Sequence, residues 1–234
     1  SGDTGARLLA AKLSERFGQP VVVENKAGAT GAVAAAEISR AEPNGQTLLF
    51  TASWHSTGAA IKKSLPFDPV KDFSPITLTI DPMGILVANN NFPPNNLREM
   101  VEWTKQNPGK AAWATSGIGS SWHINSEMAK KLGGFDVLHT PFQGFGPMVP
   151  AILNGQVPMG FFAYTSIYPM ITSGKMKVLG MTNAGGQFKS LVFPNMQSFA
   201  DIAPGIQFVP DWNAVAGPAG MPEAIEYIRN GQVR

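Results

Sequence analysis

The sequence predicts an α/β fold built around a parallel sheet, in one large domain or two small ones. Segments with apolar residues at helical spacing alternate with short, continuous apolar runs that are typical of buried parallel strands. Turns rich in glycine and proline separate them, and this alternation favours βαβ units. At about 150 residues per domain, 234 residues leave room for one to two domains.

The first third of the chain already shows this alternation. Apolar residues within Ala6–Phe17 recur at helical spacing, and Gly18 follows as a helix-ending glycine. The run Val21–Val23 predicts a buried strand. After the glycine turn of residues 28–31, the alanine-rich stretch Ala32–Arg40 predicts a helix, and Thr47–Phe50 predicts the next strand.

The rest of the chain repeats the pattern with longer spacing. The predicted strands are Ile85–Ala88, Ala111–Thr115, Val137–Thr140, Val157–Phe162, Lys177–Thr182 and Trp212–Ala216. The predicted helices are Asn96–Gln106, Ser121–Leu132, Pro147–Leu153 and Pro222–Arg229. Because a helix opens at the first residues and another has barely begun at the last, we expect further segments on both flanks.

The composition excludes several classes of protein. Hydrophobic residues make up 44% of the chain and charged residues 15%, which is typical of a folded globular protein. Eighteen basic and sixteen acidic residues, without long basic runs, argue against nucleic-acid binding. Cysteine is absent, and the three histidines lack metal-site spacing, so we expect neither a disulfide nor a metal centre. No apolar run is long enough to span a membrane.

The segment Ala114–His123 carries the clearest chemical signal. A predicted strand ends there, and a glycine turn that includes Gly119 opens a helix. Free backbone N–H groups and the helix dipole favour an anion at such a turn. Ser120 and Ser121 can cap the helix or offer hydroxyls to a carboxylate or phosphate. The alternative is an ordinary capped turn without a ligand.

Two further turns have similar chemistry. Residues 1–7 form a glycine-rich turn at the start of a helix, where Asp3 or Thr4 can act as the N-cap. Ser53, Trp54 and His55 follow a predicted strand, and ligands of open α/β sheets bind at the carboxyl ends of strands. For Asp3, capping alone is the competing interpretation; for His55, it is packing or simple surface exposure.

A catalytic alternative combines Ser120 as nucleophile with His123 as base, in a small hydrolase or transferase. The sequence around Ser120 lacks the G-x-S-x-G elbow, and the acid nearest to His123 is Glu127. We therefore expect a binding protein and not an enzyme, with no cofactor.

Several motifs, read in order, resemble those of one family. They are Asp-x-x-Ala-Arg-Leu-Leu-Ala (residues 3–10), Gly-Gln-Pro-Val-Val-Val-Glu-Asn-Lys-x-Gly-Ala (18–29), Leu-Pro-Phe-Asp-Pro (65–69) with Lys-Asp-Phe (71–73), Ala-Thr-Ser-Gly-x-Gly-Ser (114–120) and Gly-Pro-Ala-Gly-Met-Pro (217–222). Together they resemble the Bug-type substrate-binding proteins of tripartite tricarboxylate transporters.

This resemblance implies a periplasmic binding protein of type II, in which two α/β lobes joined by a hinge hold a ligand in the cleft between them. Residues 1–84 with 213–234 would form lobe 1, and residues 85–212 lobe 2. Such a receptor is exported, binds an organic carboxylate as a monomer and delivers it to the membrane permease subunits. The signal peptide would precede this numbering. A ligand-sensing domain of a signalling system is a further alternative with the same fold.

The resemblance also implies the binding residues. By motif they are Asp3, Thr4, Ser53, Trp54 and His55 in the first lobe, and Ser116, Gly119, Ser120, His123, Phe142, Gln143 and Phe162 in the second. Phe162, Trp54 and Trp122 stand where smaller or polar residues are frequent in the family. We therefore expect an aromatic or bulky carboxylate in place of a small one.

Overall fold

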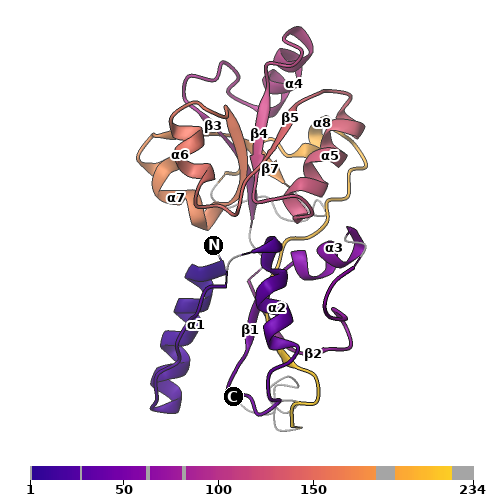
Figure 1. The fold of residues 1–234 in the computed structure, drawn as a ribbon. Coiled ribbons are helices and arrows are strands. Elements are labelled where there is room, and N and C mark those ends of the chain that lie inside the picture. The colour runs from indigo at the N-terminus through magenta and orange to yellow at the C-terminus, as the bar shows by residue number, and fades with distance from the viewer. Residues whose placement is uncertain (1, 27, 62–63, 81–82, 183–192, 223–234) are drawn as a thin grey trace. The chain divides into compact units, whose positions relative to one another are not determined.

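The computed structural model describes residues 2–26, 28–61, 64–80, 83–182 and 193–222 (Figure 1). The chain forms two compact units: unit 1 consists of Ser1–Asp81 with Trp212–Arg234, and unit 2 of Pro82–Asp211. The chain therefore passes between the units twice, at residues 81/82 and again at 211/212. The sequence-based boundaries are 84/85 and 212/213.

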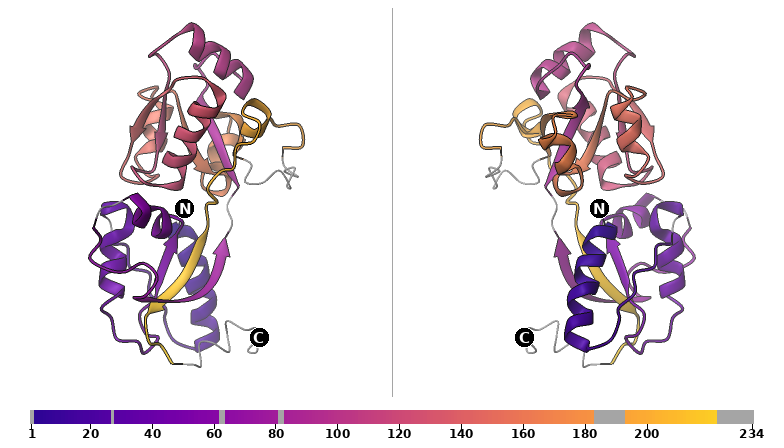
Figure 2. Two further views of the ribbon diagram at one scale, coloured as in Figure 1. Left: turned by 90° about the vertical axis from the view of Figure 1, so that its right-hand side faces the viewer. Right: turned by 90° about the vertical axis from the view of Figure 1, so that its left-hand side faces the viewer.

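Unit 1 is built on a three-stranded antiparallel sheet in the order β1-β8-β2. Its elements are α1 (Gly2–Phe17), η1 (Ala29–Gly31), α2 (Ala32–Ile38), β1 (Leu49–Ala52), α3 (Trp54–Ile61), β2 (Phe73–Ile80) and β8 (Asn213–Pro218). The central strand comes from far along the chain, as the yellow strand of Figure 2 shows. Leu49 pairs with Ala216, and Phe73 pairs with Pro218.

Two expectations for unit 1 are wrong. The run Val21–Val23 is not a strand, and the side chain of Val22 is largely exposed. A short apolar run becomes a strand only where a neighbour supplies hydrogen bonds, and the run itself does not reveal a neighbour. The sheet is also antiparallel, because β8 inserts between β1 and β2, which the local βαβ pattern could not indicate.

Unit 2 is built on a mixed five-stranded sheet in the order β5-β4-β6-β3-β7. Its strands are β3 (Gly84–Asn89), β4 (Ala112–Thr115), β5 (Leu138–Pro141), β6 (Met159–Ala163) and β7 (Met176–Thr182). Its helices are α4 (Leu97–Gln106), α5 (Ser121–Gly133), α6 (Met148–Leu153), α7 (Tyr164–Thr172) and α8 (Phe199–Ile202). Strand β4 runs parallel to β5 and β6, whereas β3 is antiparallel to β6 and β7, so the predicted parallel sheet holds only for β4, β5 and β6.

Both faces of the unit 2 sheet are covered, which explains its continuous apolar strands. Along β3, Leu86 and Ala88 belong to one hydrophobic cluster, and Ile85 and Val87 to the other. Helices α4, α5 and α8 contribute to the first cluster, and α6 and α7 to the second. Figure 1 shows α5 and α8 on the opposite side of the sheet from α6 and α7.

The helix boundaries follow from their caps. Asn96 accepts a hydrogen bond from the N–H of Glu99 and so begins α4, and Gly134 ends α5 in the left-handed conformation. Strand β2 and helices α3, α7 and α8 were not predicted. The predicted helix Pro222–Arg229 lies outside the described residues, apart from Pro222 itself.

Candidate functional site: the turn between β4 and α5

Glycine shapes the turn that connects β4 to α5. Gly117 has φ 136° and Gly119 has φ 85°, backbone conformations that residues with a Cβ rarely adopt. The turn therefore brings the backbone of residues 116–120 round to the N-terminus of a thirteen-residue helix. The first N–H groups of a helix lack partners within the helix, and they carry the positive end of its dipole.

Ser120 is the N-cap of α5. Its Oγ accepts a hydrogen bond from the backbone N–H of His123 (3.2 Å) and donates one to the carbonyl oxygen of Gly117 (2.8 Å). The side chain is only 5% exposed, so both bonds act inside the turn. These partners show a structural cap, and they leave the Ser120 proton committed to Gly117.

The loop after β5 is joined to this turn. The N–H of Phe142 donates to the carbonyl of Thr115 (3.0 Å), and the N–H of Gly144 donates to the carbonyl of Ser116 (3.2 Å). Because β4 and β5 are parallel, their carboxyl ends share one edge of the sheet. The structure thus brings together six of the predicted residues: Ser116, Gly119, Ser120, His123, Phe142 and Gln143.

A pair of stacked histidines supports the turn. The rings of His123 and His139 lie 4.3 Å apart, centroid to centroid, with an interplanar angle of 24°. Nδ1 of His123 accepts the N–H of Gly119 (3.2 Å), and Nε2 of His139 lies 2.6 Å from the hydroxyl of Thr115. His123 therefore holds Gly119 through an unprotonated Nδ1. His139 was not predicted, because only the pairing of β4 with β5 brings it to the turn.

Both histidines favour the neutral form. Burial lowers the pKa of His123, with Glu127 opposing the shift and Lys130 adding to it. Burial, together with the neighbouring His123, lowers the pKa of His139 from 6.5 to about 4. Above pH 6.5 His139 is neutral in both the folded and the unfolded chain. Between pH 6.5 and about 4 only the unfolded chain takes up a proton, so this histidine destabilises the fold as the pH falls.

We therefore expect the variant His139→Gln to lose less thermal stability than the wild type between pH 7 and pH 4.5. Melting curves of both proteins at matched ionic strength test this expectation. Parallel losses in the two proteins would show that His139 does not carry the proton linkage.

We expect Ser120→Ala to act mainly on stability, since the hydroxyl serves the cap. The loss of an N-cap costs about 0.5–2 kcal/mol. Urea unfolding measures it, with Ser116→Ala as the comparison in the same turn. A Ser120→Ala variant of full stability would contradict the capping role.

In unit 1, Asp3 pairs with neighbouring side chains. Helix α1 begins at Gly2, so Asp3 and Thr4 lie within its first turn, and the N-cap expectation for them is wrong. The Asp3 carboxylate accepts hydrogen bonds from Arg7 (3.0 Å) and from Asn25 (2.7 Å), which lower its pKa. The negative charge of an ionised Asp3 interacts favourably with the positive end of the helix dipole, and it repels an anionic ligand.

Ser53 lies between β1 and α3, and Trp54 and His55 are the first two residues of α3. The carbonyl of Ser53 accepts the hydroxyls of Ser56 and Thr57, which fixes the first turn of the helix. The indole of Trp54 packs over Gly31, where a Cβ would lie 2.5 Å from the ring.

His55 belongs to an aromatic cluster of unit 1. Its Nε2 donates to the carbonyl of Pro69 (2.8 Å), and its ring contacts Phe67 and Phe73. Burial lowers its pKa, although the bond to Pro69 opposes the shift. The Leu65–Pro69 motif is thus tied to α3, and His55 has a packing role.

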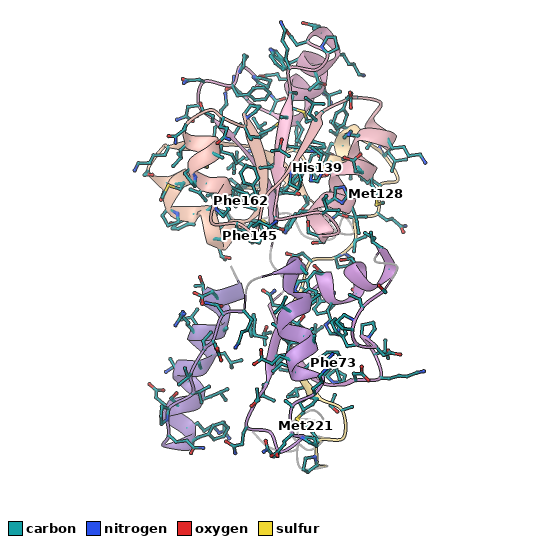
Figure 3. The ribbon with its side chains drawn as sticks, in the orientation of Figure 1. Phe73, Met128, His139, Phe145, Phe162 and Met221 are labelled. Carbon is teal, nitrogen blue, oxygen red and sulfur yellow. The ribbon has the colours of Figure 1, made fainter. Side chains whose placement is uncertain are left out.

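Phe162 lies in the core. The side chain is 1% exposed and packs on the sheet face covered by α6 and α7 (Figure 3). Its ring centroid lies 5.9 Å from that of Phe145. Trp122 is 3% exposed and stacks on Phe161 on the opposite face. This burial favours a packing role for Phe162 over a contact with a ligand. Trp54, Trp122 and Phe162 all have packing partners that account for their size.

The comparison with known proteins decides the family. The sequence pattern of the "Tripartite tricarboxylate transporter family receptor" (TctC) matches residues 5–228. The chain belongs to this family. Among related proteins, one from Bordetella pertussis is 31% identical over 226 residues, which cover 95% of this chain and 68% of that protein. BugT, also of Bordetella pertussis, is 28% identical over 235 residues, which cover 100% of this chain and 71% of BugT.

Solved structures of the same kind share the fold. The periplasmic binding protein BugD aligns with a TM-score of 0.87 and 30% identity, covering 97% of this chain and 75% of BugD. MatC of Rhodopseudomonas palustris, solved with bound malate, aligns with a TM-score of 0.85 and 30% identity. The alignment covers 99% of this chain and 78% of MatC. A second R. palustris protein, solved with adipate, aligns with a TM-score of 0.90 and 25% identity. The alignment covers 99% of this chain and 78% of that protein.

These findings confirm the predicted type II periplasmic binding fold and its Bug-type membership. This TctC-family protein is a periplasmic solute-binding receptor and not an enzyme. The catalytic alternative also fails on geometry, since the Ser120 hydroxyl donates to Gly117. Among the described residues, no helix is long and apolar enough to cross a membrane, and no three metal-ligating side chains converge.

Proposed function

We propose that this receptor binds an aliphatic organic carboxylate at the turn of residues 116–120 and delivers it to the membrane permease of a tripartite transporter. The observation that carries the proposal is the joined pair of loops at the carboxyl ends of β4 and β5, set at the N-terminus of α5. Backbone N–H groups and the helix dipole supply the positive potential that a carboxylate needs.

The packing of the aromatic side chains favours an aliphatic ligand over an aromatic one. The aromatic expectation depended on Trp54, Trp122 and Phe162, which pack against Gly31, Phe161 and Phe145. Malate and adipate, the ligands named for two similar structures, are aliphatic dicarboxylates. Thr4 and Ser53 of unit 1 stay predicted ligand contacts.

A thermal-shift screen tests the proposal. The chain is heated with malate, adipate, longer aliphatic dicarboxylates and aromatic carboxylates, each beside its uncharged amide. A ligand present at 100 times its Kd adds about 2.7 kcal/mol, which raises Tm by roughly 5–11 °C for a chain of this size.

We expect a shift with at least one aliphatic carboxylate and none with its amide. The ligand should be recovered unchanged, in keeping with a receptor. A shift confined to aromatic carboxylates would overturn the aliphatic assignment. A well-folded sample that responds to no carboxylate would overturn the proposal.

A further inference from the structure

The first turn of α5 touches the chain close to both points where it passes between the units. One crossing, at 81/82, leads directly into β3, which begins at Gly84. The other crossing follows Asp211. Ser121 contacts Asp211 and Trp122 contacts Gly84, so adjacent residues of one helical turn reach both segments.

The contact with the second crossing is a set of hydrogen bonds. Ser121 Oγ donates to Oδ1 of Asp211 (3.1 Å). One turn further along the helix, the amide of Asn125 donates to the carbonyl of Val209 (2.9 Å) and accepts the N–H of Val209 (2.8 Å). Ser121 and Asn125 are each 2% exposed, so water does not compete readily for these bonds. Three bonds therefore fasten residues 209–211 to one face of α5.

The contact with the first crossing is close packing. The indole of Trp122 lies against the backbone of Gly84, where a Cβ would stand 2.4 Å from the ring. Gly84 is fixed in turn by its pairing with Ala163 and Thr182. The start of β3 therefore follows the position of Trp122.

We propose that Ser121 and Trp122 are positioning residues. They link the turn of residues 116–120 to the start of β3 at Gly84 and to residues 209–211, the two segments next to the crossings. Ser120, the residue before them, closes the turn of residues 116–120. A helix moves as a rigid body, so a displacement of the turn reaches both crossings through three consecutive buried residues. The statement that a ligand drives this displacement depends on the proposed function, whereas the anchoring itself does not.

The anchoring predicts an effect without any ligand. The chain lacks cysteine, so Lys12→Cys in α1 and Lys105→Cys in α4, both exposed, give one spin label in each unit. Pulsed dipolar spectroscopy then reports the spread of distances between the units. We expect Ser121→Ala and Asp211→Ala each to widen that spread of distances. The double variant should show a spread no wider than that of Asp211→Ala alone.

Ser126→Ala is the matched control. Ser126 is another buried serine of α5, but its hydroxyl donates to the carbonyl of His123 within the helix (2.7 Å). This control should keep the wild-type spread. A wild-type spread in Ser121→Ala, or equal widening in Ser126→Ala, would overturn the proposal.

A second readout separates the anchoring from the ligand assignment. Calorimetry with malate and adipate should show affinity roughly fivefold or more weaker in Ser121→Ala and unchanged in Ser126→Ala. Widening of the spread in a protein that binds neither probe would support the anchoring while counting against the proposed function. Unchanged affinity in Ser121→Ala, with clear binding by the wild type, would overturn the link to the ligand.

Discussion

Replacing Trp122 by alanine is expected to lower the free energy of unfolding by about 3–5 kcal/mol, the range for a large aromatic side chain removed from a core. The indole is 3% exposed, stacks on Phe161 with ring centroids 6.3 Å apart, and fills the space over Gly84. Urea unfolding followed by circular dichroism measures the loss without relying on the indole fluorescence that the substitution removes.

The control is Trp122→Phe, which keeps most of the apolar contact. It should cost less than Trp122→Ala, and a saturating carboxylate should stabilise it as it does the wild type. A Trp122→Ala variant with the stability of the wild type would contradict the packing role of the indole.

The second large effect is expected for Gly117→Ala in the turn. With φ at 136°, Gly117 holds a backbone conformation that a Cβ disfavours, at a cost of about 1–3 kcal/mol. Relief of this strain would move the Gly117 carbonyl, which accepts bonds from both the N–H and the Oγ of Ser120. We expect carboxylate affinity to fall by roughly tenfold or more, since about 1.4 kcal/mol corresponds to tenfold.

Gly146→Ala is the matched control for this substitution. Gly146 lies in the neighbouring loop, has an ordinary φ and has open space where a Cβ would be added. Calorimetric titration of both variants should show the loss only in Gly117→Ala. Equal affinities in the two variants would show that the conformation of the turn does not matter for binding.

Local patterns in the sequence predicted much of unit 2. The strand and helix around residues 111–132 were predicted to within a residue or two, because a buried strand, two glycines and a capping serine follow one another directly. The turn of residues 116–120 could be proposed as a site for the same reason. These signals depend on neighbours in sequence, so no tertiary contact was needed to interpret them.

Features that depend on distant pairing could not be predicted in this way. The insertion of β8 between β1 and β2 makes unit 1 antiparallel, although its local pattern suggests parallel strands. His139 reaches His123 only because β5 pairs with β4. The contact of Ser121 with Asp211 joins residues ninety positions apart and has no local signal.

The expectation of an aromatic ligand depended on side chains whose packing partners the sequence could not reveal. Phe161 and Phe162 point to opposite faces of β6, as consecutive residues of a strand do. Helices cover both faces of this sheet, however, so both side chains have packing partners in the core. Alternation tells which face a residue occupies, but not whether that face is buried.

An amide-resolved NMR titration of the full chain shows whether the turn of residues 116–120 binds a carboxylate. Malate and adipate are each added to the ¹⁵N-labelled protein, with the corresponding diamides as uncharged controls. We expect saturable shifts, largest at the backbone amides of residues 116–119 and 143, with a carboxylate and not with its diamide. Saturable shifts centred elsewhere, with these amides unmoved, would contradict binding at this turn.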